Sequence, residues 1–497
     1  MIREKRATLT LLMILCSVLV AFPNVEIVKA EPKTIVVPDD FASIQEAVDN
    51  APEGGTVFVR SGSYEKRVRI RKPLSLIGEN AKNTIIETPE IIYSEAIIFV
   101  DSENVTVSGF TIKNCDYAIW APSRCKIVGN KIENAQYGIA IGGGDNIISG
   151  NNITGRYDGI RADLDDSLIS GNIITGHRNI GISVSSGKNL TVYNNKISTN
   201  KVGVRLGGSG PFYVYGNNIT YNEAFGIQLF GCNNSSIYEN NIVGNGAGVE
   251  LENYDYQSSA PGSGNFVYQN NFVNNQQQVV IDKTWNVLQW DLTEYFPDAI
   301  NGTDSASWHK DKVGNYWSSY KGTDNEGDGI GDSPYIIDEE NQDNYPLMAP
   351  IKIFDAGIWE WVSYNVDVVS NSSVSDFSFN PESNLVRFNV EGETGTTGFC
   401  RITIPKGLLN TGGEWTVLVG GSPVTATVNE DTDNTYLNFT YDHSTKTVEI
   451  IGTTAIPEFP SWIVLPLVIT TTLLILIYKK SLPKKHQNQK KSFILGA

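Results

Sequence analysis

The stretch that decides the fold repeats a five-residue element at a near-constant interval: Tyr137-Gly-Ile-Ala-Ile, Asp158-Gly-Ile-Arg-Ala, Ile180-Gly-Ile-Ser-Val, Val202-Gly-Val-Arg-Leu and Phe225-Gly-Ile-Gln-Leu. A second element alternates with it, as in Gly150-Asn-Asn-Ile, Gly171-Asn-Ile-Ile and Gly216-Asn-Asn-Ile. Its isoleucines lie 21 to 23 residues apart, at Ile132, Ile153, Ile174, Ile197, Ile219 and Ile242. The sequence therefore contains an internal repeat of about 22 residues.

Each repeat has the pattern of short strands separated by Gly/Asn turns, and no helical period runs through it. A single coil of this length cannot bury its apolar face, whereas stacked coils share one core of Ile, Val and Leu. Asparagines at equivalent turns tolerate left-handed backbone geometry and can hydrogen-bond along the stack. We therefore predict an all-β chain whose main body, residues 31–305, is a parallel β-helix of about ten coils.

Two segments resemble known families. Thr34-Ile-Val-Val-Pro-Asp-Asp, Ser43-Ile-Gln-Glu-Ala and Gly54-Gly-Thr-Val-Phe-Val resemble the opening of right-handed pectin-lyase-like β-helices, with a short helix over 44–48. Gly314-Asn-Tyr-Trp, Gly327-Asp-Gly-Ile-Gly-Asp and Asp343-Asn-Tyr-Pro-Leu resemble the closing segment of NosD-type periplasmic copper-binding β-helix proteins. The resemblance implies a right-handed helix, a capping segment at 306–350 and, as one function, copper delivery.

Residues 351–455 form a separate module with alternating strand patterns, such as Phe399-Cys-Arg-Ile-Thr-Ile. The turn spacing favours a β-sandwich. The strands and the following Ile456-Pro-Glu-Phe-Pro resemble the membrane-proximal sandwich and stalk of archaeal surface proteins.

The two ends predict a secreted, anchored protein. Residues 1–30 have a basic start, an apolar run and small residues before a cleavage site at Ala30, which is typical of a signal peptide. Within 456–478, the apolar run Phe459 to Tyr478 is long enough to span a membrane. The tail 479–497 carries six lysines, which the positive-inside rule places in the cytoplasm. We expect a single-pass type I protein at the cell surface, with its bulk outside and the membrane as a partner.

The charge excludes one class of partner. Of the net charge of −17, residues 1–30 contribute +2 and residues 479–497 contribute +6, which leaves −25 for residues 31–478. An acidic exterior opposes nucleic-acid binding, which needs a basic footprint. Beyond the signal region, Cys115 and Cys125 either pair across one coil or stay as buried thiols. Sequons begin at Asn104, Asn189, Asn301 and Asn438, among others.

An acidic loop is the candidate metal site. Asp324, Glu326, Asp328 and Asp332 supply oxygens around Gly329, a spacing that suits Ca²⁺, with a solvated acidic turn as the alternative. The twelfth-position glutamate of an EF-hand is missing, because Tyr335 stands there. Copper is disfavoured, because His177, His309, His443 and Met348 are scattered without ligand spacing.

The candidate binding surface is a column on one strand of the repeat. The fourth residue of each five-residue element points outward. Successive coils give Trp120, Ala140, Arg161, Ser183, Arg205, Gln228 and Glu250. We predict that Trp120, Arg161, Arg205, Gln228 and Glu250 contact an acidic glycan; a solvated polar face is the alternative.

Catalytic candidates are Asp158, Asp165, Asp166, His177 and Arg178, because paired Asp and Gly-His resemble polygalacturonase residues. Asp165 and His177 fall at opposite ends of equivalent strands, roughly 15 Å apart, too far to share a substrate atom. Asp158 is closer to His177 and Arg178 across adjacent coils and stays a candidate, but a structural turn is the favoured interpretation of these residues.

These observations favour a non-catalytic surface protein that binds or scaffolds polysaccharide of the envelope or the extracellular space. A polysaccharide-cleaving enzyme of the pectin-lyase-like class and a NosD-type copper-delivery protein are the alternatives.

Overall fold

The computed structural model describes residues 34–87, 95–208, 210–252, 264–282, 306–359 and 362–455. They divide into two compact units. The first holds the described residues up to Phe266 together with 272–306, and the second holds 267–271 together with those from Ser307 onward. The predicted signal peptide (1–30) and the predicted membrane span (459–478) lie outside the described residues. Within the described part of the chain, no helix is both long and apolar enough to cross a membrane.

The first unit opens with a helix, as the sequence predicts. Helix α2 (Ile44–Asn50) begins after Ser43, whose hydroxyl accepts a hydrogen bond from the backbone N–H of Glu46. This cap satisfies one of the free N–H groups of the first turn. Ile44, Ala47 and Val48 are buried. Because the helix packs mainly on the first strands, it covers the apolar end of the stack.

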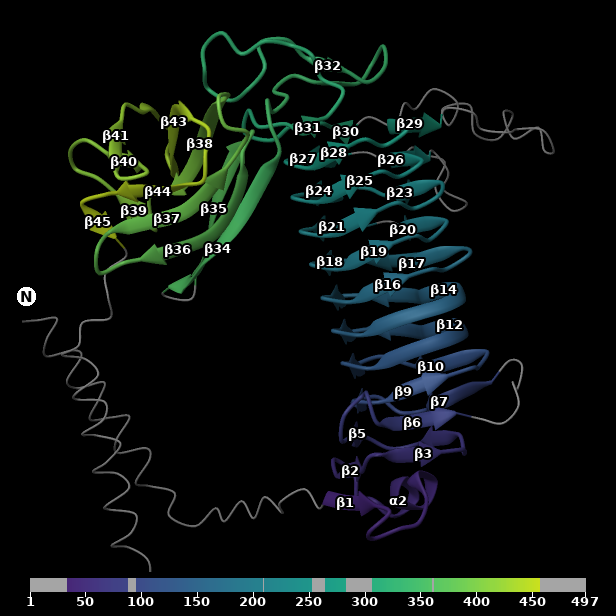
Figure 1. The fold of residues 1–497 in the computed structure, drawn as a ribbon. Helices are drawn as coiled ribbons and strands as arrows, with labels where there is room; N and C mark the ends of the chain where they lie inside the picture. Colours follow the sequence, from purple (N-terminus) through teal and green to yellow (C-terminus); the bar gives the residue numbers. More distant parts are fainter. Residues whose placement is uncertain are drawn as a thin grey trace, which may run out of the picture. The chain divides into compact units, whose positions relative to one another are not determined.

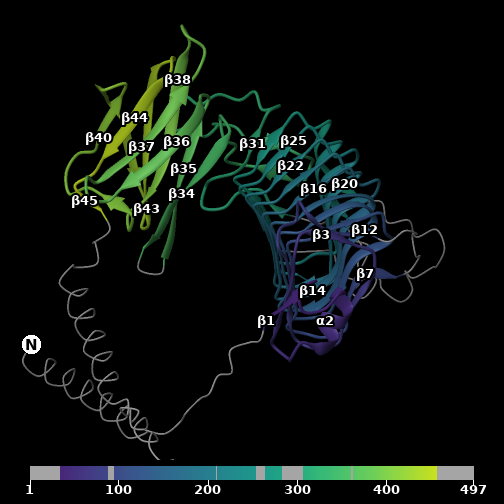
Figure 2. The ribbon, with the colours of Figure 1, turned by 60° about the horizontal axis from the view of Figure 1, so that its bottom comes forward.

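The rest of the unit is a parallel β-solenoid of about ten turns (Figure 1). One parallel sheet contains β1 (Thr34–Val37), β2 (Thr56–Val59), β5 (Ser75–Gly78), β8 (Thr106–Ser108), β11 (Lys126–Val128), β13 (Ile147–Ser149), β15 (Leu168–Ser170), β18 (Leu190–Tyr193), β21 (Phe212–Tyr215), β24 (Ser236–Tyr238) and β27 (Asn265–Tyr268). Each of these strands pairs with the equivalent strand of the next coil, and in Figure 2 the strands of successive coils lie behind one another.

The other strands belong to a second sheet that contains both repeated sequence elements. It comprises β3 (Gly62–Tyr64), β4 (Val68–Ile70), β6 (Thr84–Glu87), β7 (Ala96–Val100), β9 (Thr111–Lys113), β10 (Tyr117–Ala121), β12 (Lys131–Gly144), β14 (Asn152–Asp165), β16 (Ile173–Thr175), β17 (Ile180–Lys188), β19 (Lys196–Ser198), β20 (Val202–Gly207), β22 (Asn218–Thr220), β23 (Phe225–Phe230), β25 (Asn241–Val243), β26 (Ala247–Glu252), β28 (Asn271–Val273) and β29 (Gln277–Asp282). The repeat isoleucines from Ile132 to Ile242 are completely buried, so they form one row of the core.

Asparagine side chains link the coils. The first ladder contains Asn130, Asn151, Asn172, Asn195, Asn217 and Asn240. The Oδ1 of each later member accepts the backbone N–H of the member before it, at 2.9–3.0 Å. The amide groups also donate to carbonyls of the preceding coil, as from Asn172 Nδ2 to Ile148 O at 2.9 Å. The ladder therefore satisfies buried backbone groups that the turns leave without strand partners.

The second unit contains two antiparallel five-stranded sheets within the described residues. One has the order β34 (Ile351–Trp359), β35 (Val362–Ser370), β38 (Thr397–Pro405), β43 (Asn434–Asp442), β42 (Thr427–Glu430). The other has the order β36 (Ser373–Asn380), β37 (Leu385–Glu391), β44 (Lys446–Ile451), β40 (Thr416–Val419), β41 (Ser422–Val424). Short strands β39 (Leu409–Asn410) and β45 (Thr454–Ala455) pair separately. Both sheets contribute to one core, for example Val368 and Phe388.

The segment 307–350 packs with this second unit. It contains β31 (Tyr316–Trp317), β32 (Tyr335–Ile336) and β33 (Gln342–Asp343), and β30 (Ala306–Ser307) ends at its start. Leu347 and Ala349 form a cluster with Ile351 and Val369, on strands of the first antiparallel sheet. The segment predicted as a cap is therefore joined to the sheet module by an apolar contact.

The structure shows the burial of the cysteines and of the sequon asparagines. All four described cysteines are free and buried, so Cys115 and Cys125 do not form the disulfide that the sequence left open. Burial raises the pKa of the Cys115 thiol to about 12. Among the sequon asparagines, Asn104 and Asn189 are exposed, whereas Asn438 is buried. Asn301 lies outside the described residues.

Candidate functional site

The predicted column exists as a continuous strand-to-strand register. Consecutive backbone partners are Phe99, Trp120, Ala140, Arg161, Ser183, Arg205, Gln228 and Glu250, on β7, β10, β12, β14, β17, β20, β23 and β26. Arg69 on β4 precedes Phe99, and Val280 on β29 follows Glu250. Arg69 and Phe99 were not among the predicted column residues, which begin at Trp120. The spacing in Ala96-Ile-Ile-Phe99-Val was the available signal.

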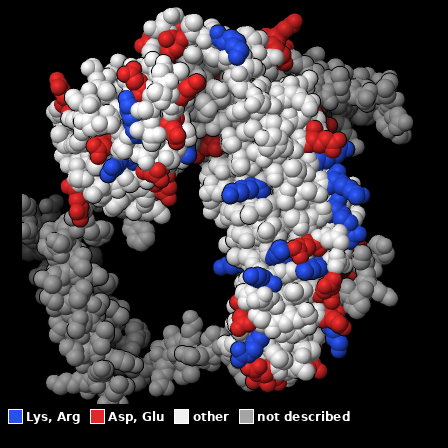
Figure 3. Space-filling view, viewed as in Figure 1, with Lys and Arg blue, Asp and Glu red and all other residues white. Residues whose placement is uncertain are grey.

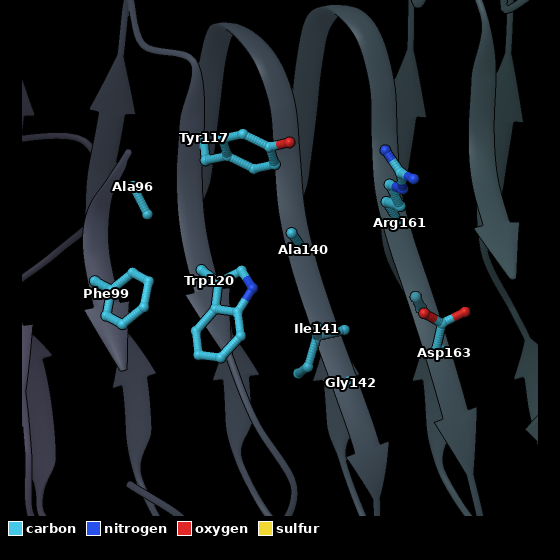
Figure 4. A pocket seen from close by; sticks show the side chains of 10 residues that line it. Ala96, Phe99, Tyr117, Trp120, Ala140, Ile141, Gly142, Arg161 and Asp163 are labelled. Carbon is cyan, nitrogen blue, oxygen red and sulfur yellow. The ribbon is translucent and has the colours of Figure 1, made fainter. Parts of the chain in front are cut away.

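The middle of the column forms a groove. It has a volume of about 530 Å³ and is lined by Ala96, Phe99, Tyr117, Trp120, Ala140, Ile141, Gly142, Arg161, Ala162 and Asp163 (Figure 4). Phe99 and Trp120 stack with ring centroids 4.7 Å apart and planes 7° apart. Trp120 keeps 37% of its surface exposed, although one ring face is covered by Phe99. The groove therefore offers an aromatic surface beside polar groups.

Arginines define the electrostatics of this stretch. Arg161 is exposed and lies 5.9 Å from the Tyr137 ring centroid, and Arg205 lies 5.2 Å from that of Phe230. Such cation–π contacts hold the guanidinium groups while leaving N–H donors available. In Figure 3 basic side chains gather along the solenoid edge beside β12 to β20, with acidic ones above and below. Between β14 and β20 the column carries two arginines, Arg161 and Arg205, on a chain that is acidic as a whole.

The end of the column differs from the expectation of an open surface. Gln228 and Glu250 are only 8% and 6% exposed. The amide of Gln228 donates to the carboxylates of Glu250 and Glu252. Gln228 and Glu250 are therefore buried and hydrogen-bonded to each other. The accessible part of the predicted surface consists of Trp120, Arg161 and Arg205.

The structure places the catalytic candidates on adjacent coils, where Asp158 and Asp165 accept backbone N–H groups of the next coil. Asp158 is buried and accepts hydrogen bonds from Asn179 Nδ2 at 2.8 Å and from the Ile180 N–H at 3.0 Å. Burial raises the pKa of Asp158 above its ordinary value. Asp165, the last residue of β14, accepts the Lys188 N–H at 3.0 Å at the opposite end of the paired strands. These contacts tie neighbouring coils together.

The remaining candidates lie in turns. Asp166 has a positive φ of 46° and accepts Asn189 Nδ2 at 2.7 Å. Arg178 is exposed, and its backbone N–H donates to Arg156 O at 3.2 Å. Their observed contacts are those of structural turn residues. A catalytic role for any of the five candidates stays a prediction.

His177 begins a second ladder that continues through Asn200, Asn222, Asn245 and Asn275. Its Nδ1 is 2.9 Å from Asn200 Oδ1, and Nε2 is buried without a hydrogen-bond partner. The ring fills space beside Gly155, where an added Cβ would lie 2.9 Å from Nε2. Burial lowers the pKa of His177 to about 4, so the imidazole is neutral at physiological pH.

In the acidic loop, aspartate side chains accept hydrogen bonds from backbone N–H groups of the same loop. Asp324 accepts the N–H groups of Asp328 at 3.1 Å and Gly329 at 2.8 Å, and Asp332 accepts that of Asn325 at 2.9 Å. Arg401 of β38 donates to the Asp328 carbonyl at 3.1 Å. Glu326 is exposed. Within the described residues, no three His, Cys, Asp or Glu side chains are grouped so as to hold a metal ion. Calcium binding stays a prediction.

The described donors also do not fit copper. His177 is buried against Asn200, and His309 packs edge-on against Tyr345. His443 is bonded to Ser372 Oγ through Nε2 at 2.8 Å and to Thr396 through Nδ1. Since copper prefers several His, Cys or Met ligands together, these separate environments supply no site.

Fold and register together define a parallel β-solenoid with a groove on one sheet that is lined by aromatic rings, Arg161 and Asp163. Residues 81–261 match the family model described as periplasmic copper-binding protein (NosD). This match and the solenoid agree with the predicted NosD-type β-helix. No curated protein matches the chain.

Several solved structures are similar in fold. The Azotobacter vinelandii mannuronan C-5 epimerase AlgE6 A-module is 16% identical, with a TM-score of 0.35, over 55% of this chain and 81% of that one. The periplasmic alginate epimerase AlgG is 18% identical, with a TM-score of 0.36, over 57% and 78%. The Dettilon tailspike protein is 11% identical, with a TM-score of 0.35, over 84% and 93%.

Proposed function

We propose that this protein binds acidic polysaccharide outside the cell, along the column from Trp120 to Arg205, without cleaving it. The observation that carries the proposal is the register that aligns Trp120, Arg161 and Arg205 on one sheet face. The signal peptide and membrane span expected at the two ends would place this face outside the cell and attach it to the membrane.

The chemistry of the column suits a chain of acidic sugars. An indole offers apolar area to the apolar face of a sugar ring, at low cost in side-chain entropy. Guanidinium groups bind carboxylates through two parallel N–H···O bonds. Arg161 and Arg205 belong to strands two coils apart, about 10 Å, so they contact successive parts of an extended ligand. A linear polyanion can therefore contact the aromatic and both arginines at once.

The non-catalytic part of the proposal rests on the contacts of the acid/base candidates. Asp158 and His177 are both buried, with the carboxylate bonded to Asn179 and Ile180 and the imidazole to Asn200, and Asp165 is at the other end of the paired strands. General acid/base catalysis needs groups within reach of one substrate atom.

The test uses the purified full-length chain with polyuronates and neutral polysaccharides, analysed by size-exclusion chromatography. We expect co-elution with intact polyuronate, and a loss of affinity of about tenfold or more when Arg161→Ser and Arg205→Ser are combined, because charge-assisted hydrogen bonds are lost. The matched control combines Lys126→Ser and Lys196→Ser, which removes the same charge from exposed positions outside the column. If both double variants lose the same affinity, the loss is caused by the change in net charge and not by the column. Shortened polyuronate would instead establish an enzyme.

A further inference from the structure

The column alternates large and small side chains in its middle. Trp120, Arg161 and Arg205 are separated by Ala140 and Ser183, each one coil away from its larger neighbours. Below this stretch Phe99 stacks directly on Trp120, and above it Gln228 and Glu250 occupy adjacent coils in contact with each other. The alternation is therefore confined to the coils from β10 to β20.

Ala140, only 8% exposed, lies at the base of the groove between Trp120 and Arg161. Adjacent coils lie about 4.8 Å apart, so the strands that carry these two residues are about 10 Å apart. One face of the indole is covered by Phe99, and the other is turned toward the coil of Ala140, whose side chain ends at Cβ. A ring in van der Waals contact with both neighbours needs about 7–8 Å between them. The spacing of the two strands is therefore enough for one ring above Ala140.

The polar groups beside Ala140 determine which kind of ligand ring can bind there. Arg161 supplies a cation on one side, and Asp163, two residues further along β14, supplies an exposed carboxylate at the edge of the same groove. Asp163 Oδ1 accepts the Ser186 hydroxyl at 3.3 Å and has further lone pairs for hydroxyl donors. Figure 4 shows Trp120, Ala140, Arg161 and Asp163 on neighbouring strands of one face. This set matches a ring with one apolar face, hydroxyl groups and a carboxylate.

We infer that the opening between Trp120 and Arg161 is a subsite for a single hexuronate ring, and that the small side chain of Ala140 determines its width. The inference rests on the proposed polysaccharide binding and adds the sugar class and the residue that sets specificity. The ring stacks on the free face of Trp120, its carboxylate pairs with Arg161, and its hydroxyls donate to Asp163.

The test fills the opening without touching its polar groups. Ala140→Leu places a branched side chain between Trp120 and Arg161, at an outward position where neighbouring coils already carry Trp and Arg. Titration calorimetry of the full-length chain with a uronate trisaccharide should show at least a tenfold loss of affinity, whereas Ala140→Gly should retain binding. Val280→Leu, further along the same column, is the control for added volume. Ala140→Val serves as a second, strand-compatible variant, with folding checked by circular dichroism.

The outcomes separate the two proposals. If the wild-type chain binds no polyuronate and no uronate trisaccharide, the proposed function fails and takes this inference with it. If the wild type binds and the Arg161/Arg205 double variant is weakened, but Ala140→Leu and Ala140→Val bind like the wild type, only the subsite is overturned. Equal affinity for the corresponding neutral trisaccharide would overturn the assignment to a uronate.

Discussion

At the scale of single residues, His177 shows how a catalytic-looking side chain can have a structural position. The Gly-His pair suggested chemistry in the sequence, but in the fold the imidazole begins the ladder that Asn200 continues. The unpaired Nε2 lies in the interior, beside a glycine that leaves room for the ring. The neutral imidazole is favoured at this buried site, because the charged imidazolium would lose its hydration there.

Replacing His177 with Asn tests that role through the pH dependence of stability. The folded pKa is about 4, below the ordinary value of 6.5, so the unfolded state binds more protons between these values. The wild type should therefore lose stability as the pH falls from about 6.5 to 4. Thermal unfolding of His177→Asn should show a weaker loss over that range, because Asn keeps the bond to Asn200 and does not titrate. Identical pH profiles would contradict a buried, neutral His177.

At the scale of elements, the first asparagine ladder explains the second sequence motif of the repeat. Its Asn-x-Ile pattern places the asparagine inside, on the ladder, and the isoleucine two residues later in the core. The NosD-like closing motif contains a similar chain within the second unit. There Asn270 N–H donates to Asn315 Oδ1 at 3.1 Å, and Asn315 N–H and Trp317 Nε1 donate to Asp343 Oδ2 at 2.7 and 2.9 Å. A buried carboxylate ends the series, because it accepts from several donors and needs no further partner.

The acidic loop is the element whose role is open to a direct measurement. If Asp324, Asp328 and Asp332 bind Ca²⁺, chelation should lower the melting temperature of the full-length chain, since a ligand that binds only the folded state stabilises it. Added Ca²⁺ should restore it in the wild type and not in Asp328→Asn. Unchanged melting after chelation would leave these carboxylates with the turn-forming hydrogen bonds that the structure shows.

At the scale of the whole molecule, the chain consists of two units with different ways of building a core. In the solenoid each coil contributes to one continuous core. In the second unit two antiparallel sheets pack against each other and share one core. Within the second unit, Asp367 of β35 lies near Arg401 and accepts a hydrogen bond from Gln269 at 3.3 Å. Burial raises the pKa of Asp367 to about 6 despite these favourable contacts.

This carboxyl should make the second unit less stable as the pH rises. Its folded pKa of about 6 exceeds the ordinary 3.8, so the folded state binds more protons in that window and stability is lost between about pH 4 and 6. Asp367→Asn mimics the protonated form and keeps an acceptor for Gln269. Calorimetric unfolding should show a flatter pH dependence for the variant than for the wild type. A parallel pH dependence in both proteins would exclude Asp367 as the cause.

The sequence by itself determined the parallel β-solenoid, the short helix at its start, the β-rich module after residue 350 and the outward column from Trp120 to Glu250. These follow from short-range rules, because a repeat fixes which residues face the core and which positions stack. Tertiary structure decided the rest: Phe99 covers one face of Trp120, Gln228 and Glu250 are buried against each other, and His177 belongs to a ladder. It also joined 307–350 to the sheet module. The burial of a side chain and its contacts depend on side chains of neighbouring coils and strands. A local sequence pattern does not predict which of these side chains meet.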